Sequence, residues 1–249
     1  MGMSMEMSGC VLRLTLDSPH SGNALDDAAL ASLGQALDRA EADAAVRVLV
    51  IAATGPVFCS GADLGGTPGT APAEAARLYF RTLRRITRSA RTVVCVVDGA
   101  AQAGGIGLLA ASDYVICSEQ ASFRLPEVLL GLIPACVLPF LIRRVGVHAS
   151  QMLALSAHKI DARRALELHL VDQVAADTGE ALRRLILSVA RTPPQAVAAL
   201  KDYMGRLAPV GEREEELAVA GIAALMAQPE ALARVHELAA HGVWGGTRP

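Results

Sequence analysis

Two short segments rich in glycine and other small residues are the first places where this chain could do chemistry. Residues 59–64 (CSGADL) follow one apolar run, and residues 97–107 (VDGAAQAGGIG) lead from a second apolar run into a helix pattern. Small side chains leave backbone amides accessible, and the start of a helix adds free N–H groups at the positive end of its dipole. Two such amides converging on one oxygen would stabilise an enolate. Each segment by itself is more commonly an ordinary turn.

Glu127 is the acidic residue that could act beside such amides. It follows Pro126 within an apolar run, residues 125–134 (LPEVLLGLIP). A carboxylate just after a proline in the first helical turn often serves only to balance the helix dipole. A carboxylate facing an acyl carbonyl can instead take the proton α to that carbonyl and pass it to a leaving group. The residue types alone leave both interpretations open.

Spacing and composition exclude several other kinds of site. The glycines of residues 99–107 lack the spacing and the later acidic ribose ligand of a dinucleotide fingerprint, and there is no P-loop. The six histidines match no metal-site spacing, so we expect no metal. With 23 basic against 25 acidic residues and a net charge of -2, the chain has no basic stripe for nucleic acid. No apolar run reaches the about 18 residues of a membrane span.

The five cysteines are widely spaced, with no CxxC pair. The chain also opens without the charged and apolar regions of a signal peptide. Together these features predict free thiols and a cytoplasmic location. No base stands beside Cys136 in the sequence, so we expect this residue to be a small apolar wall of a pocket and no nucleophile.

The elements that must position these groups alternate between strands and helices. Period-two or β-branched patterns predict strands, and apolar residues at helical spacing predict helices, the first of them capped by Asp26 or Asp27. Repeated strand–helix–strand units imply a mainly parallel sheet with right-handed crossovers. The predicted strands are 10–16, 46–53, 93–97 and 114–117, and the predicted helices are 25–45 and 74–89.

The pattern changes to helices alone from about residue 147 onward. We divide the chain into a core, residues 9–190, and a C-terminal helical region, residues 191–243. The apolar stripes of the last helices exceed what a short lobe can bury, so we expect them to pack on the core or on another subunit. These helices are predicted at 195–207, 212–227 and 229–241, and the ends, 1–8 and 244–249, are predicted to be disordered.

The ordered set of motifs resembles the enoyl-CoA hydratase/isomerase, or crotonase, superfamily. The resemblance covers residues 9–243. It implies an α/β spiral of repeated strand and helix units, a C-terminal region that forms homotrimers or dimers of trimers, an acyl-thioester substrate and no cofactor. The motifs are GNAL at 22–25, SGADL at 60–64, DGxxxxGGxGLLAASD at 98–113 and SFRLPEVLLGLIP at 122–134.

The resemblance also implies roles for particular residues. The amides that hold the thioester oxygen fall on Ala62 and Gly104, and one catalytic glutamate falls on Glu127. A second glutamate of the hydratases is replaced here by Gly107, which puts plain hydration in doubt because that mechanism uses both acids. Further pocket candidates are Asp63, Gly107, Cys136 and Tyr79, the last of which lies on a helix where a lone tyrosine is more often core or rim than acid.

A finer resemblance concerns residues 125–144, where ACVLPFL replaces a glycine-rich stretch of ordinary hydratases. This run is similar to the first, dehydrating hydratase-like enzymes of polyketide β-branching cassettes. It implies dehydration of 3-hydroxy-3-methylglutaryl to 3-methylglutaconyl on the phosphopantetheine of an acyl carrier protein. An enoyl-CoA isomerase or hydratase using coenzyme A stays open, as does a non-catalytic scaffold.

A glutaryl-type substrate would carry a second carboxylate away from the thioester. A cation near the pocket wall is expected to bind that carboxylate. The candidates are Arg77, Arg81, Arg84 and Arg124, and spacing alone does not choose among them.

Overall fold

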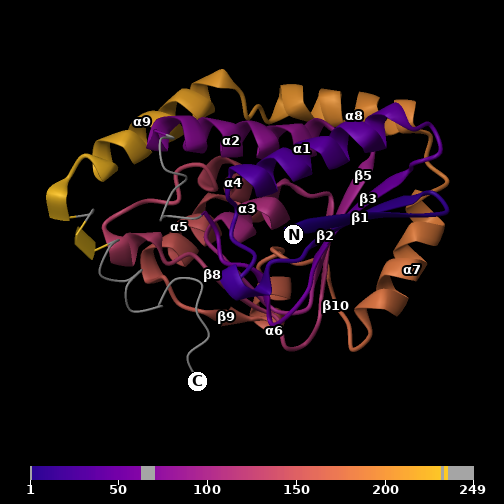
Figure 1. Ribbon diagram of the computed structural model, residues 1–249, viewed down its shortest axis with the longest axis horizontal. Coiled ribbons are helices and arrows are strands. Elements are labelled where there is room, and N and C mark those ends of the chain that lie inside the picture. The colour runs from indigo at the N-terminus through magenta and orange to yellow at the C-terminus, as the bar shows by residue number, and fades with distance from the viewer. Residues whose placement is uncertain (1, 63–70, 231–232, 235–249) are drawn as a thin grey trace.

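A computed structural model describes residues 2–62, 71–230 and 233–234. A six-stranded sheet forms its centre (Figure 1), in the order β1-β2-β3-β5-β7-β10. The β1–β2 pair is antiparallel and every other pair is parallel. These strands are β1 (Met3–Ser8), β2 (Val11–Leu16), β3 (Val48–Ala53), β5 (Thr92–Val97), β7 (Tyr114–Cys117) and β10 (Gln173–Val174).

A second sheet of four short strands has the order β4-β6-β8-β9. Three of these strands each follow one strand of the first sheet along the chain, β4 after β3, β6 after β5 and β8 after β7. This repeat produces a spiral, and it confirms the predicted mixed α/β fold class. The four strands are β4 (Val57–Cys59), β6 (Ala100–Gln102), β8 (Ser122–Arg124) and β9 (Ile160–Asp161).

Helices cover both faces of the large sheet. In Figure 1, α1, α2, α8 and α9 lie along one side of the molecule, while α7 lies beside the other face, where Ala181 and Leu182 pack on β3, β5 and β7. Asp26 caps α1 as predicted, its carboxylate accepting the Ala29 N–H at 2.7 Å. The helices are α1 (Asp27–Ala42), α2 (Pro72–Arg88), α3 (Gly104–Ala111), α4 (Leu138–Val145), α5 (Val147–Ser156), α6 (Ala162–Glu167), α7 (Thr178–Val189), α8 (Pro194–Leu207) and α9 (Glu212–Met226), with 3-10 turns η1 (Pro19–Ser21) and η2 (Glu127–Leu130).

Two expectations, one for the N-terminal residues and one for the region after residue 147, are wrong. The predicted disordered tail 1–8 contains β1, in which Met3, Met5 and Met7 pack against the core while the residues between them are exposed. The region after residue 147 is not helical throughout, because β9 and β10 each add a short strand to a sheet. Most of the predicted helix 229–241 lies outside the described residues.

A buried carboxylate joins α9 to α2. The side chain of Glu215 is only 2% exposed, and its oxygens lie 3.2 Å from Arg77 Nη1, 2.8 Å from Arg81 Nε and 3.1 Å from Arg84 Nη1. A buried charge is tolerated only when it is paired in this way. The ion cluster therefore fixes α9 over the body of the protein. Among the described helices, none has both the length and the apolar character that a membrane span would need.

Candidate active site

Both predicted amide donors follow a residue with a positive φ angle. Gly61, with φ 103°, precedes Ala62, and Ala103, with φ 46°, precedes Gly104. Such a backbone suits glycine, but it strains an alanine and persists only where the surrounding structure imposes it. In both segments, the residue before the donor turns the chain at the donor N–H, and the surrounding residues must hold that turn in place.

The two turns approach each other closely. A Cβ atom added to Gly61 would lie 2.6 Å from the Cβ of Ala103 and 3.0 Å from the amide nitrogen of Gly104. A Cβ atom added to Gly104 would lie 3.4 Å from the amide nitrogen of Ala62. The structure thus brings together the two segments that the sequence singled out, and only glycine fits at position 61.

The amides of Ala62 and Gly104 are available to a ligand. Over residues 2–62, 71–230 and 233–234, neither donates to a backbone oxygen of the turns and loops. Gly104 is the first residue of α3, where an N–H has no partner within the helix. Both residues line a mainly apolar cavity of about 220 Å³. The geometry suits an oxyanion hole, and that role stays a prediction.

Glu127 lies on the wall of the same cavity. It is the first residue of η2 and is 9% exposed. Burial raises the pKa of its carboxyl from 4.5 to about 7. Its Oε2 atom is buried and has no hydrogen-bond partner among the described residues. A carboxyl that lines a cavity, has its pKa raised toward neutral pH and has an oxygen without a partner among these residues is suited to proton transfer.

We expect turnover to fall as the pH drops below about 7, because a base must be ionised to take a proton and burial places the pKa of Glu127 there. The profile of kcat/KM against pH reports this ionisation in the free enzyme. An inflection near the ordinary glutamate value of about 4.5, or no inflection, would exclude Glu127 as the base.

Tyr79, on α2, lines the cavity and contacts the start of α3. Its hydroxyl donates a hydrogen bond to the carbonyl oxygen of Gly104 at 2.5 Å. A Cβ atom added to Gly107 would overlap Tyr79 Oη and would lie 3.1 Å from Tyr79 Cζ and 3.0 Å from Leu83 Cδ1. The phenol therefore occupies the space into which an acidic side chain at position 107 would project.

Cys136 and Asp63 are the remaining pocket candidates. Cys136 lines the cavity, and burial raises the pKa of its thiol to about 12, which agrees with the expected apolar wall. Its Sγ–H donates to Ala76 O at 3.5 Å. Asp63 lies outside the described residues.

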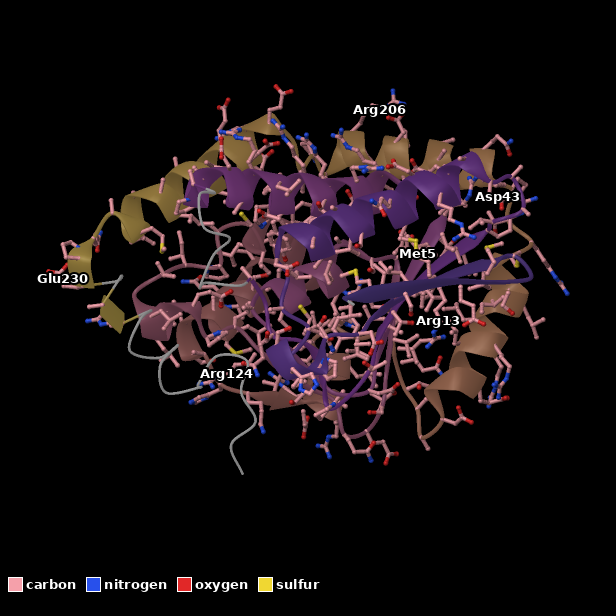
Figure 2. The ribbon with its side chains drawn as sticks, in the orientation of Figure 1. Met5, Arg13, Asp43, Arg124, Arg206 and Glu230 are labelled. Atoms are coloured by element: carbon pink, nitrogen blue, oxygen red, sulfur yellow. The ribbon has the colours of Figure 1, made fainter. Side chains whose placement is uncertain are left out.

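None of the four arginines proposed for a distal carboxylate lines the cavity. Arg77, Arg81 and Arg84 all pair with Glu215. Arg124 donates to Ala157 O at 2.8 Å, and Figure 2 shows it on the side of the molecule away from Arg206 of α8. The expectation failed because spacing along a helix or a strand shows which residues share a face but not what that face meets.

Sequence reasoning missed the contribution of α9 to the site. Ile222, Leu225 and Met226 line the cavity, so part of the apolar stripe of α9 closes the pocket of its own chain. Asp26 and Asp27, at the start of α1, line it as well. A signal was present in the spacing of the α9 side chains, but this spacing does not distinguish a pocket from a subunit contact.

The fold and the cavity define a class of α/β spiral enzyme, and comparisons with known proteins identify its family. The family model for enoyl-CoA hydratase/isomerase matches residues 6–223. The chain is 30% identical over 210 residues to the bacillaene synthase dehydratase PksH of Bacillus subtilis, covering 82% of this chain and 81% of that one. It is 33% identical over 187 residues to the 1,2-epoxyphenylacetyl-CoA isomerase of Escherichia coli, covering 70% and 71%.

Solved structures agree with these relatives. The crystal structure of PksH from Bacillus subtilis superposes with a TM-score of 0.88 at 26% identity, covering 96% of this chain and 97% of that one. The chain belongs to the enoyl-CoA hydratase/isomerase family of the crotonase superfamily. The predicted class of enzyme, a hydro-lyase of that superfamily, is confirmed.

Proposed function

We propose that the protein dehydrates 3-hydroxy-3-methylglutaryl, carried on an acyl carrier protein, to 3-methylglutaconyl-acyl-carrier-protein in polyketide β-branching. One observation carries the proposal: Glu127 is the only buried carboxylate among the described residues that line the cavity. Gly107 occupies the position of the second acid, and the Tyr79 hydroxyl fills the space beside it. The similarity to PksH, a dehydratase of bacillaene synthase, and the ACVLPFL run support the choice of substrate.

In this mechanism the thioester oxygen accepts hydrogen bonds from the N–H groups of Ala62 and Gly104. Ionised Glu127 removes the proton on the carbon α to the carbonyl, and the two amides hold the charge of the enolate that forms. The protonated Glu127 then gives that proton to the β-hydroxyl, which leaves as water while the α–β double bond forms. One carboxylate suffices because the two proton positions lie on the same face of the substrate.

The partner in this proposal is the carrier protein, whose phosphopantetheine arm supplies the thioester, and no separate cofactor takes part. We further propose a homotrimer or a dimer of trimers. Large apolar side chains exposed on α8 support an assembly that covers them. They are Leu200, Tyr203, Met204 and Leu207.

A second candidate is an isomerase or hydratase of acyl-CoA thioesters whose acyl chain carries no charge. It is favoured by the absence of lysine and arginine from the described lining of the cavity. A distal carboxylate would find no cation among those residues, whereas an alkyl chain would meet apolar walls. A scaffold without activity is disfavoured, because it leaves the raised pKa and free oxygen of Glu127 without a use.

Mass spectrometry of loaded carrier protein tests the proposal. Incubation with the purified enzyme is expected to lower the mass of 3-hydroxy-3-methylglutaryl carrier by one water, about 18 Da, with no loss of carbon dioxide. The matched substrate is 3-hydroxy-3-methylbutyryl on the same carrier, which keeps the tertiary alcohol and lacks the distal carboxylate. Faster dehydration of the matched substrate, or turnover of enoyl-CoA esters only, would contradict the proposal in favour of the second candidate.

A further inference from the structure

The backbone at the start of α3 needs an anchor from outside the helix. Ala103 holds a strained φ of 46° with ψ -117°, and two glycines, Gly104 and Gly105, follow it. Backbone hydrogen bonds hold Ala103, whose N–H donates to Arg124 O at 3.0 Å and whose carbonyl oxygen accepts from Ile106 N–H at 2.9 Å. Glycine leaves the backbone at 104 and 105 unusually free, so a contact at the peptide after Gly104 is also needed to hold this turn.

The hydroxyl of Tyr79 supplies such an anchor. It donates to Gly104 O at 2.5 Å, and the side chain is 9% exposed on the buried face of α2. Burial, followed by the nearby groups of Cys59, Cys136 and Glu127, raises the pKa of the phenol well above its usual value of 10.0. The hydroxyl therefore keeps its proton while Glu127 titrates, and the hydrogen bond persists through the working pH range.

The anchor depends on glycine at position 107. Any Cβ there would overlap Tyr79 Oη and would press on Leu83 Cδ1 at 3.0 Å. Tyr79 reaches Gly104 only because position 107 has no side chain. The absence of an acidic side chain at position 107 and the hydrogen bond from Tyr79 to Gly104 therefore depend on each other.

We propose that Tyr79 is a positioning residue for the oxyanion hole, which holds the first turn of α3 so that the Gly104 N–H faces the thioester oxygen. The role rests on the thioester site of the proposed function but not on the acyl chain or its carrier. Tyr79 acts through Gly104, because the single hydrogen of its hydroxyl is donated to the carbonyl oxygen of that residue.

Tyr79→Phe keeps the ring and removes the hydroxyl. We expect kcat to fall about tenfold, less than the 10²–10³ that follows outright loss of an oxyanion donor. KM and the melting temperature should stay close to those of the wild type. Tyr114→Phe makes the same chemical change at a residue that is 39% exposed on β7, and it should leave kcat unchanged. A folded Tyr79→Phe enzyme with unchanged kcat, or with only a raised KM, would overturn the role.

Gly107→Ala tests the same contact from the other side. The added methyl group should displace the phenol and lower kcat about tenfold in the wild-type background, but by much less in the Tyr79→Phe background, where the hydroxyl is already gone. Losses that multiply in the double variant would show two independent sites and overturn the proposal.

A reaction-independent readout separates this role from the choice of substrate. The α proton between the two carbonyls of an acetoacetyl thioester is acidic enough to be lost to water or buffer, and the two amides then hold the ultraviolet-absorbing enolate in the site. Enolate formation that weakens in Tyr79→Phe supports the positioning role even if the wild type fails on the glutaryl substrate, which would overturn the proposed function alone. Equal enolate formation in the wild type and in Tyr79→Phe would overturn the role alone.

Discussion

Replacing Glu127 by glutamine is expected to lower kcat by about 10²–10⁴, the usual contribution of a general acid–base group. Glutamine keeps the shape of the side chain but neither takes nor returns a proton. The Oε2 atom of Glu127 has no partner among the described residues, so an amide group at that position breaks no hydrogen bond of this atom. The loss should appear in single-turnover rates of dehydration with little change in binding.

Two controls separate catalysis from folding in this experiment. Burial favours the neutral form of Glu127, so its contribution to stability is greatest below a pH of about 4.5 and is lost as the pH rises through about 7. Glu127→Gln should therefore raise the free energy of unfolding by about 1–3 kcal/mol at pH 8 and by little at pH 4. Glu119→Gln, at an exposed site, should change neither kcat nor the free energy of unfolding. A folded Glu127→Gln enzyme with near wild-type turnover would remove Glu127 from the mechanism.

Gly61→Ala is expected to reduce kcat by about 10²–10³, because it forces apart the two turns that carry the donor amides. The new methyl group would meet Ala103 Cβ at 2.6 Å and the Gly104 amide nitrogen at 3.0 Å. The φ of 103° adds strain for any residue with a side chain. We expect the loss mainly in kcat, since the amides act most strongly on the enolate.

Gly9→Ala is the matched control for backbone strain. Gly9 also has a positive φ, 59°, but it lies between β1 and β2, and an added Cβ meets nothing within 4 Å. Gly9→Ala should lower the stability of the fold modestly and leave kcat unchanged. If Gly61→Ala retains full kcat while folded, the close approach of the two turns has no catalytic role.

Local patterns predicted the strands that are rich in β-branched residues, and they failed where those residues are rare. The β-branched runs become β3 and β5, and the apolar stripe at 25–45 becomes α1. The strand β1 was missed because alternating Met, Ser and Glu side chains have a weak preference for strands. Its stability comes from pairing with β2 and from packing on the core, which no local pattern records.

The same distinction holds within the site. The order of the motifs around Ala62, Gly104 and Glu127 was enough to determine the family and the three groups that line one cavity. Only the tertiary structure decided that Tyr79 lies against Gly107 and that α9 closes the pocket. Sequence spacing defines which residues share a face, since that follows from helix and strand geometry. The partner of each face depends on how segments distant in the chain pack together, and here this packing places the phenol of Tyr79 where a second acid would otherwise lie.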